Sequence, residues 1–452
     1  MRDLMALFAV VSLVAMGFRN PFIAYMAWTW TALIALNTYV YSFMTSVGLN
    51  QIFALLTLGL VLIGADKLKQ PFDVNRTVVL LLLFAVQALA SATFAYPDMG
   101  RNWEFATDLL KIVTFCLVMP MLVTTRTRIL AMVTVMALGM SFHGLLDGLK
   151  LIASGGGHLA RGNPKFGDNN HFAVMLSMVV PVTYYVYQYA THRLVRLGSL
   201  AVSGLTVLAV VATHSRGGLL CVGAMAMALI LNSRRKVAGI VAVVLFAVAG
   251  LALAPDSWTE RMGTMKEAGE DGSFMGRVMA WKRSSAMAME HPFVGAGLGA
   301  AAERVIYWKF AYKDGFLGFI KTPPPDGIAL VAHSIYFQVL GDMGFVGFFI
   351  YMALLANAFL ARREIRRLVK QSAADLSWAG DLADMLAVSL LAFMVGGALV
   401  SIAYQEFMFM ILMLLTVLKR QVVKEFALLA SPQVKAAGAA PAHAPLRQLS
   451  SL

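Results

Sequence analysis

Four side chains, one histidine and three arginines, have types and positions suited to chemistry at a membrane surface. His333 opens the apolar run 333–360, and Arg161, Arg216 and Arg277 lie in three separate connections. A neutral imidazole, with an intrinsic pKa near ~6.5, can take a proton from a hydroxyl group as a general base. The planar guanidinium group of arginine binds phosphate oxygens through paired hydrogen bonds. These residues therefore predict proton abstraction beside a phosphate-bearing ligand.

Plain structural roles compete with this interpretation. Arg216 could extend to lipid headgroups or pair with a carboxylate, and Arg161 and Arg277 could be ordinary surface charges. His333 could be held by a neighbouring backbone carbonyl. Orientation in a membrane does not require arginines on the outer side, so three of them beside a helix-opening histidine favour the phosphate-bearing ligand.

Further polar side chains near these four residues are secondary candidates for substrate binding. Lys282 and Arg283 share an amphipathic segment and could guide the phosphates of a donor or an acceptor, and Ser215, Asn170 and Tyr336 could contact substrate. Four other histidines are expected on the same side of the membrane as His333, and a structural role at the membrane interface is the simpler expectation for each. They are His143, His171, His214 and His291.

The composition predicts a helical membrane protein. Of 452 residues, 59% are hydrophobic and only 13% are charged, and apolar runs of about 18 residues recur along the chain. The ~10-residue alternating segments of a membrane barrel are absent. Cys116 and Cys221 lie inside apolar segments, which argues against disulfides and zinc. The opening apolar run lacks the cleavage site of a signal peptide.

The distribution of basic residues predicts how the chain crosses the membrane. One set of alternate connections holds 18 Lys and Arg residues, whereas the opposite short connections hold 4. The net charge of +13 therefore reflects membrane orientation rather than nucleic-acid binding, and the basic set is expected in the cytoplasm. The basic connections are 66–76, 124–128, 190–196, 232–236, 361–370 and 419–424.

About twelve crossings are expected, with both termini inside. The apolar segments divide the chain into an N-terminal membrane bundle (1–254), a periplasmic loop domain (255–332), C-terminal membrane helices (333–420) and a disordered tail (421–452). Within the loop domain, 275–291 predicts an amphipathic helix that Pro292 ends, and a second helix is expected at 300–313.

Motifs for metals and nucleotides are absent from the sequence. It contains no HExxH, CxxC or Walker pattern, and 295-GAGLG-299 does not open a βαβ unit. Asp98, Glu104 and the pair Glu270–Asp271 could bind a divalent ion, but their spacing is not specific. We therefore expect no cofactor and no metal site.

Taken in order, the polar motifs resemble the O-antigen ligase/polymerase superfamily. An Arg-x-x-Gly…Asn loop appears as Arg161-Gly-Asn163 followed by 167-GDNN-170, and a Ser-Arg-Gly turn appears at 215–217. Arg277 is followed by Trp281, Pro292 and 295-GAG-297, and His333 opens a helix that contains Gly341 and Gly344. The resemblance covers about residues 150–355. The chain has Asp-Asn-Asn at 168–170, where Asp-Pro-Asn is common in the family.

The resemblance implies a metal-independent membrane glycosyltransferase of GT-C-like architecture in the bacterial inner membrane. The donor would be a glycan on undecaprenyl pyrophosphate, and the acceptor of a ligase would be the lipid A–core oligosaccharide. His333 would act as the general base at the periplasmic face, and Arg161, Arg216 and Arg277 would bind the pyrophosphate, with inversion at the anomeric carbon. The alternatives are an O-antigen polymerase or a protein O-glycosylation ligase of the same superfamily, and a transporter.

Overall fold

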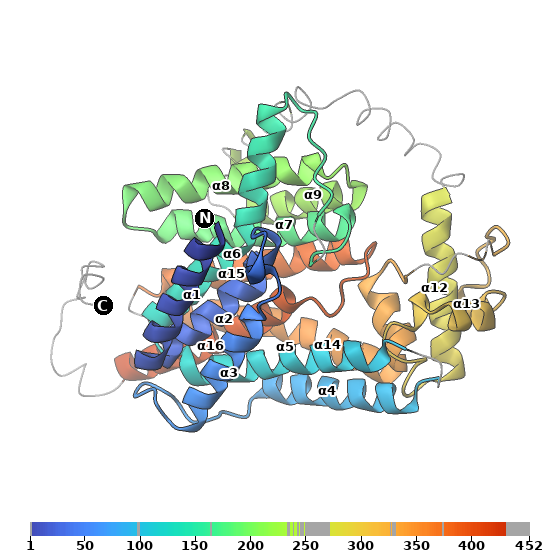
Figure 1. Cartoon of the computed structure of the whole chain (residues 1–452), viewed down its shortest axis with the longest axis horizontal. Helices are drawn as coiled ribbons and strands as arrows, with labels where there is room; N and C mark the ends of the chain where they lie inside the picture. Colours follow the sequence, from blue (N-terminus) through green and yellow to red (C-terminus); the bar gives the residue numbers. More distant parts are fainter. Residues whose placement is uncertain are drawn as a thin grey trace.

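The computed structural model describes most of the chain, and every regular element in the described part is a helix (Figure 1). The described residues are 2–96, 100–162, 165–232, 272–325, 331–372 and 375–430, with Gly327 and scattered positions between 236 and 248. The predicted crossing 237–254, the segment 249–271, Asn163, Asp98 and the tail beyond Ala430 lie largely or wholly outside these residues.

The helices follow the apolar segments of the sequence closely. In the first half they are α1 (Arg2–Arg19), α2 (Pro21–Ile34), α3 (Leu49–Leu62), α4 (Arg76–Phe94), α5 (Asn102–Leu122), α6 (Arg126–Ala153), α7 (Asn169–Tyr189), α8 (Arg193–Ala212) and α9 (Arg216–Asn232). In the second half they are α12 (Gly272–Glu290), α13 (Arg304–Phe310), α14 (Ile335–Gln371), α15 (Ser377–Gly397) and α16 (Glu406–Ala430).

Helix starts coincide with side chains that satisfy free backbone N–H groups. The Asn75 side chain accepts a hydrogen bond from the N–H of Val78, and the Thr125 side chain accepts one from Arg128. Asn20 caps α2 directly before Pro21, a residue that fits the first helical turn because it has no N–H to satisfy. Local sequence thus fixes where the apolar helices begin.

Six described helices are long and apolar enough to cross a membrane: α4, α5, α6, α8, α14 and α15. Three shorter apolar helices, α2, α3 and α9, accompany them. The prediction of an all-α polytopic membrane protein is confirmed. The number of about twelve crossings stays a prediction.

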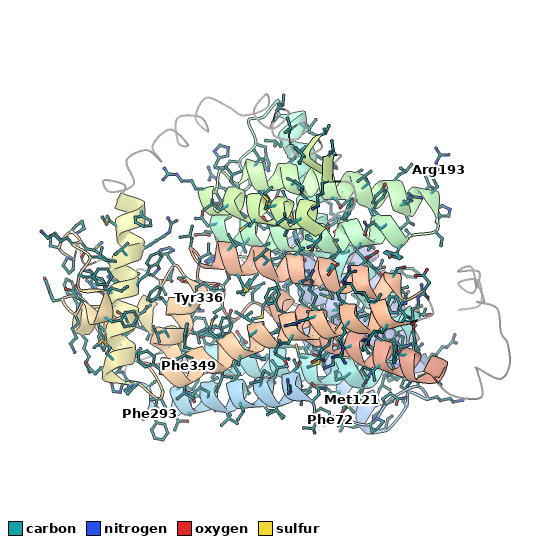
Figure 2. All side chains as sticks on the ribbon, turned by 180° about the vertical axis from the view of Figure 1, so that it is seen from behind. Phe72, Met121, Arg193, Phe293, Tyr336 and Phe349 are labelled. Carbon is teal, nitrogen blue, oxygen red and sulfur yellow. The ribbon has the colours of Figure 1, made fainter. Side chains whose placement is uncertain are left out.

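The helices form one bundle, with α12 and α13 at one end as a cap (Figure 1). Glu290 at the end of α12 fixes the cap: it accepts a hydrogen bond from Tyr96 at 2.8 Å and pairs with Lys309 at 3.1 Å and with Lys313. Figure 2 places Phe293 near the cap and Arg193 at the opposite end. The basic connection 190–196 therefore lies far from the cap.

Ion pairs hold the basic connections together at that far end. Arg128 donates two hydrogen bonds to the buried carboxylate of Asp66, at 2.7 and 3.1 Å. Arg362 donates to Asp384 at 2.7 Å, and Lys419 pairs with Glu364. Four of the connections that sequence analysis grouped by charge are thereby joined in space: 66–76, 124–128, 361–370 and 419–424.

Two helices run further than their apolar segments predict. α14 continues through the basic stretch 361–370, because Ala361 and Ile365 stay buried against the bundle at helical spacing. α16 continues to Ala430, ten residues past the boundary expected at 420. The predicted second cap helix, 300–313, is shorter, with a regular helix only from Arg304 to Phe310.

Candidate active site

The segment before α7 and the turn between α8 and α9 are joined by polar contacts. Asp168 caps α7 by accepting hydrogen bonds from the N–H groups of Asn170 and His171, both at 2.9 Å. The side chain of Asn169 donates to the carbonyl of Thr213 at 2.8 Å. The start of α7 is therefore fixed against the end of α8.

Ser215 connects this corner to the start of α9. Its hydroxyl donates to the side-chain oxygen of Asn170 at 2.8 Å and accepts from the N–H of Gly218 at 3.1 Å. These contacts bring two predicted binding residues together and set Arg216 at the first position of α9. A helix N-terminus attracts anions, so the helix end and the guanidinium group of Arg216 would both stabilise a bound anion.

Arg161 lies in an exposed loop that folds back on itself. The preceding residue, Ala160, donates its N–H to the carbonyl of Ala212 at 2.9 Å, which ties the loop to the end of α8. Gly162 has a left-handed backbone (φ +81°), and a Cβ there would lie 2.6 Å from the carbonyl oxygen of Gly167. Lys165 pairs with Glu406 of α16 at 2.8 Å. The Arg161 side chain itself is exposed at this end of the bundle.

Glycines allow α14 to contact the turn after α12. The N–H of Ala296 donates to the carbonyl of Gly341 at 2.9 Å, and the N–H of Phe345 donates to the carbonyl of Pro292 at 2.8 Å. Gly344 adopts φ +68° and ψ −168° and kinks α14 there. The Gly-x-Gly and Gly341/Gly344 motifs are therefore two sides of one backbone contact.

Two polar residues of α4 complete that contact, and sequence analysis did not single them out. Gln87 donates to the carbonyls of Phe293 at 2.6 Å and Met343 at 2.9 Å, and Ser91 donates to the carbonyl of Asp342 at 2.6 Å. A lone amide within the apolar run 77–96 was the available signal, since a buried amide requires partners.

Trp281 anchors α12 to the first turn of α14. Its ring stacks on Phe337 with centroids 5.4 Å apart and planes at 10°. Its indole nitrogen is buried and has no hydrogen-bond partner in the part of the chain that the structure describes. On the same helix, Ser284 lies against Gly341, where a Cβ would be 3.1 Å from the serine side chain. The α12 face that carries Arg277 is thus held against α14.

His333 lies two residues before α14 in a left-handed backbone conformation (φ +47°). A residue with a Cβ adopts this conformation at a cost of about 1–3 kcal/mol, and such strain concentrates at functional sites. Partial burial lowers the pKa of His333, and the positive charges of Arg277 and Arg283 act in the same direction. The carboxylate of Asp168 opposes this shift. The imidazole is therefore held neutral at physiological pH, the form that accepts a proton.

The remaining candidates divide into two groups. Arg277, Arg283 and the start of α7 lie close enough to His333 to act on its charge. Lys282 instead pairs with Asp314 at 2.9 Å, and the Tyr336 hydroxyl donates to the carbonyl of Met394 at 3.0 Å. Tyr336 therefore has a structural partner in α15.

His171, for which an interfacial role was expected, also acts on the charge of His333. Among the described residues, no group of three or more His, Cys, Asp or Glu side chains is arranged to hold a metal ion.

Two family models match the chain. Residues 200–352 match the family described as O-Antigen ligase, and residues 1–191 match a family of unknown function (DUF5935). The match at residues 200–352 supports membership of the O-antigen ligase/polymerase superfamily. The resemblance predicted from the ordered motifs is confirmed at this level. No curated protein matches the chain.

The ligase match covers three of the candidate catalytic residues. Arg216, Arg277 and His333 lie within residues 200–352, whereas Arg161 and Asn170 lie in the part matched by the family of unknown function. The match indicates an enzyme class related to glycosyl transfer, and the apolar helices support a multi-pass membrane protein.

Proposed function

We propose that the protein transfers a glycan from undecaprenyl pyrophosphate to a sugar hydroxyl of lipid A–core, with His333 as general base. The observation that supports this most directly is the environment of His333. Its imidazole is partly buried, and Arg277 lies close enough to help to lower its pKa, so the imidazole is neutral at physiological pH. A neutral base next to a cation suits a reaction in which a hydroxyl loses a proton while negative charge develops on a phosphate.

The arginines would bind the pyrophosphate of the donor. Arg277 lies on α12, which packs against α14. Arg216 lies at the start of α9, which packs against α7. Arg161, exposed on the loop tied to α8, would complete the set as donor enters. Each guanidinium group that stabilises the leaving group is worth ~3–4 kcal/mol, or about 100- to 1,000-fold in rate. No divalent ion is then required.

The bonds change as follows in the proposed reaction. The acceptor hydroxyl oxygen attacks the anomeric carbon while its proton passes to the imidazole of His333. The bond from that carbon to the pyrophosphate oxygen breaks, and undecaprenyl pyrophosphate leaves as the anion bound by arginine. One direct displacement inverts the configuration at the anomeric carbon. The polyprenyl chain would lie along apolar helix faces in a GT-C-like arrangement.

The side of the membrane follows from the basic connections. Those at the far end from the cap would face the cytoplasm by the positive-inside rule. The cap, His333 and the three arginines would then face the periplasm of a bacterial inner membrane. This is where lipid-linked glycans and completed lipid A–core are expected to meet.

The test is transfer by the purified protein in EDTA, with undecaprenyl-pyrophosphate-linked glycan and lipid A–core. Mass spectrometry would follow the product and the released lipid for wild type, His333→Asn and His192→Asn. Asparagine tolerates the left-handed conformation of position 333, and His192 is an exposed histidine near the opposite end. We expect loss of transfer only in His333→Asn. Chain extension on the donor lipid alone would instead indicate a polymerase, and transfer only to an added protein would indicate a protein ligase.

A further inference from the structure

A pocket lies between four helices at the end of the bundle opposite the cap. It has a volume of about 430 Å³ and lies where α4 begins and α5 ends, beside α14 and α16. Figure 2 labels Phe72 and Met121, the chain neighbours of two lining residues, away from Phe293 and the cap. This volume is in the range of ordinary ligand pockets.

Three cations and two carboxylates line the pocket. The cations are Arg76, Lys419 and Arg420, and the carboxylates are Asp73 and Glu364. Lys419 pairs with Glu364, so one carboxylate, that of Asp73, remains for two arginines. Neither arginine forms an ion pair with Asp73 or with any other residue that the structure describes. Two guanidinium groups of one pocket therefore keep hydrogen-bond donors for a ligand.

Arg420 is the more informative of the two because its side chain is partly buried. Its guanidinium group donates one hydrogen bond to the described part of the chain, to the carbonyl of Val123 at 3.3 Å. Burial lowers the pKa of Arg420, and the negative charge of Asp73 opposes this shift without cancelling it. A guanidinium group has five N–H donors, and burying them without partners costs free energy. An anion in the pocket would supply partners for these donors.

The rest of the lining is partly polar and partly apolar. Arg76 is exposed, whereas Thr77 beside it is only 4% exposed. The Thr77 hydroxyl shares a hydrogen bond with Thr416 at 2.6 Å and accepts one from the side chain of Asn357 at 2.9 Å. Val417 adds a buried apolar side chain. Such a mixed lining suits a charged group that is carried on a less polar body.

A phosphate group fits this place better than other anions. Guanidinium groups bind phosphate oxygens through paired hydrogen bonds. Phosphate headgroups lie at the surface of a membrane, and basic pockets between helices at its cytoplasmic surface bind them. By the positive-inside rule, the end of the bundle opposite the cap would face the cytoplasm.

We propose that this pocket binds a phosphate group through Arg76 and Arg420, at the opposite end of the bundle from the proposed transfer site. The phosphate comes either from the headgroup of an anionic phospholipid or from a soluble phosphate. A bound phosphate would join α4, which carries Arg76, to α16, which carries Arg420. The acyl chains of a lipid would lie along the exposed side chains of Val79 and Val423 on the same two helices. The proposal is independent of the proposed function, because it involves neither donor nor acceptor.

The test measures binding to the full chain in detergent, by native mass spectrometry for lipids and by isothermal titration for inorganic phosphate. The lipids are dioleoyl phosphatidylglycerol, which is anionic, and dioleoylglycerol, which has no phosphate group. Wild type is compared with the pocket variant Arg76→Gln/Arg420→Gln and with the control variant Arg363→Gln/Arg367→Gln. The control removes two exposed arginines of α14 that lie in the basic connection 361–370 and do not line the pocket.

The pocket variant should bind its phosphate ligand at least about tenfold more weakly than wild type, and the control variant should bind it nearly as well as wild type. Phosphatidylglycerol bound without inorganic phosphate identifies the lipid headgroup as the source. Inorganic phosphate whose binding the pocket variant weakens shows that a soluble phosphate suffices. Both results support the site.

Three results would overturn the proposal: dioleoylglycerol binding as tightly as phosphatidylglycerol, a pocket variant that binds like wild type, and a control variant that is weakened as much as the pocket variant. The last result would indicate general attraction to a basic surface. If the pocket variant does not fold, Arg76→Gln alone decides, because Arg76 is exposed and its side chain makes no hydrogen bond or ion pair in the described chain. That variant should bind about fivefold more weakly, and unchanged binding would refute the site.

Discussion

Replacing Gly344 by alanine tests whether the contact between α14 and the cap positions the site. Gly344 has φ +68° and ψ −168°, a region that only glycine adopts without strain, so a side chain there costs about 1–3 kcal/mol. The new Cβ would also lie 2.6 Å from the carbonyl oxygen of Pro292 and 2.9 Å from the nitrogen of Gly295. These are backbone atoms that cannot rotate away, and such overpacking adds about 1–3 kcal/mol. The sum is a destabilisation of about 2–6 kcal/mol.

The overlap can be relieved only if the turn after α12 moves away from α14. That movement would break the Phe345–Pro292 hydrogen bond and shift α12, which carries Arg277. A displacement of about 1 Å at a catalytic group can cost ~100-fold in rate. We therefore expect Gly344→Ala to insert in the membrane, unfold at a lower temperature and transfer glycan roughly 100-fold more slowly.

Unfolding is measured in detergent with a thiol-reactive fluorophore, because Cys116 and Cys221 are free and buried and react only as the bundle opens. The control is Gly204→Ala in α8, where a Cβ meets nothing within 4 Å. That variant should be as stable as wild type or slightly more stable, since alanine has a higher helix propensity than glycine. Equal unfolding temperatures and equal transfer rates for both variants would show that the α14 kink does not hold the site.

Three further predictions concern charge and local contacts. Arg277→Gln should move the acidic limb of the kcat/KM profile to higher pH. Arg277 helps to lower the pKa of His333, so its loss raises that pKa. An acidic limb that stays in place in steady-state assays would contradict this. Ser215→Ala should cost about 1 kcal/mol in stability by removing a helix cap. It should also raise the KM for donor, because the Ser215 hydroxyl holds the Asn170 side chain. An unchanged KM for donor would show that Asn170 does not bind the donor. Arg128→Met should destabilise the protein by about 3–5 kcal/mol, because Asp66 stays buried without its partner, and adding Asp66→Asn should restore much of the loss in the same thiol assay.

The helices were largely predictable from the sequence because lipid requires long apolar segments whose backbone groups are satisfied internally. Boundaries were less predictable where tertiary packing extends a helix beyond its apolar run. In α14, Ile365 lies among arginines yet is fully buried, so the helix continues to Gln371. Only the distant elements that cover Ile365 decide this, and hydropathy along the chain does not record them.

For the candidate site, the sequence offered residues whose roles stay predictions, and it did not give their arrangement in space. His333 and Arg216 were singled out as polar side chains at the ends of apolar segments, and Arg277 as an arginine on the side of the membrane where arginine is disfavoured. The sequence did not indicate that Lys282 turns away toward Asp314, while its neighbour Arg283 acts on His333. That difference depends on how α12 is rotated against α14, which the Gly341 contact with Ser284 sets.

The strained backbone at position 333 allows the role of the imidazole to be separated from the role of the fold. Asparagine enters the left-handed region more readily than alanine does, and it also retains a polar side chain. We therefore expect His333→Asn to be more stable than His333→Ala by up to about 1–2 kcal/mol, because alanine, like histidine, adopts the left-handed conformation at a cost. Neither variant has a group that titrates near neutral pH.

Transfer decides between the two roles. If His333 is the general base, both variants lose transfer by about 100- to 10,000-fold, irrespective of their difference in stability. If His333 matters only because it tolerates the turn before α14, His333→Asn keeps transfer and only His333→Ala loses it. Activity that follows the unfolding temperature would therefore overturn the base assignment. Activity lost equally in a stable and a less stable variant would support it, because removal of the proton acceptor is the change that the two variants share.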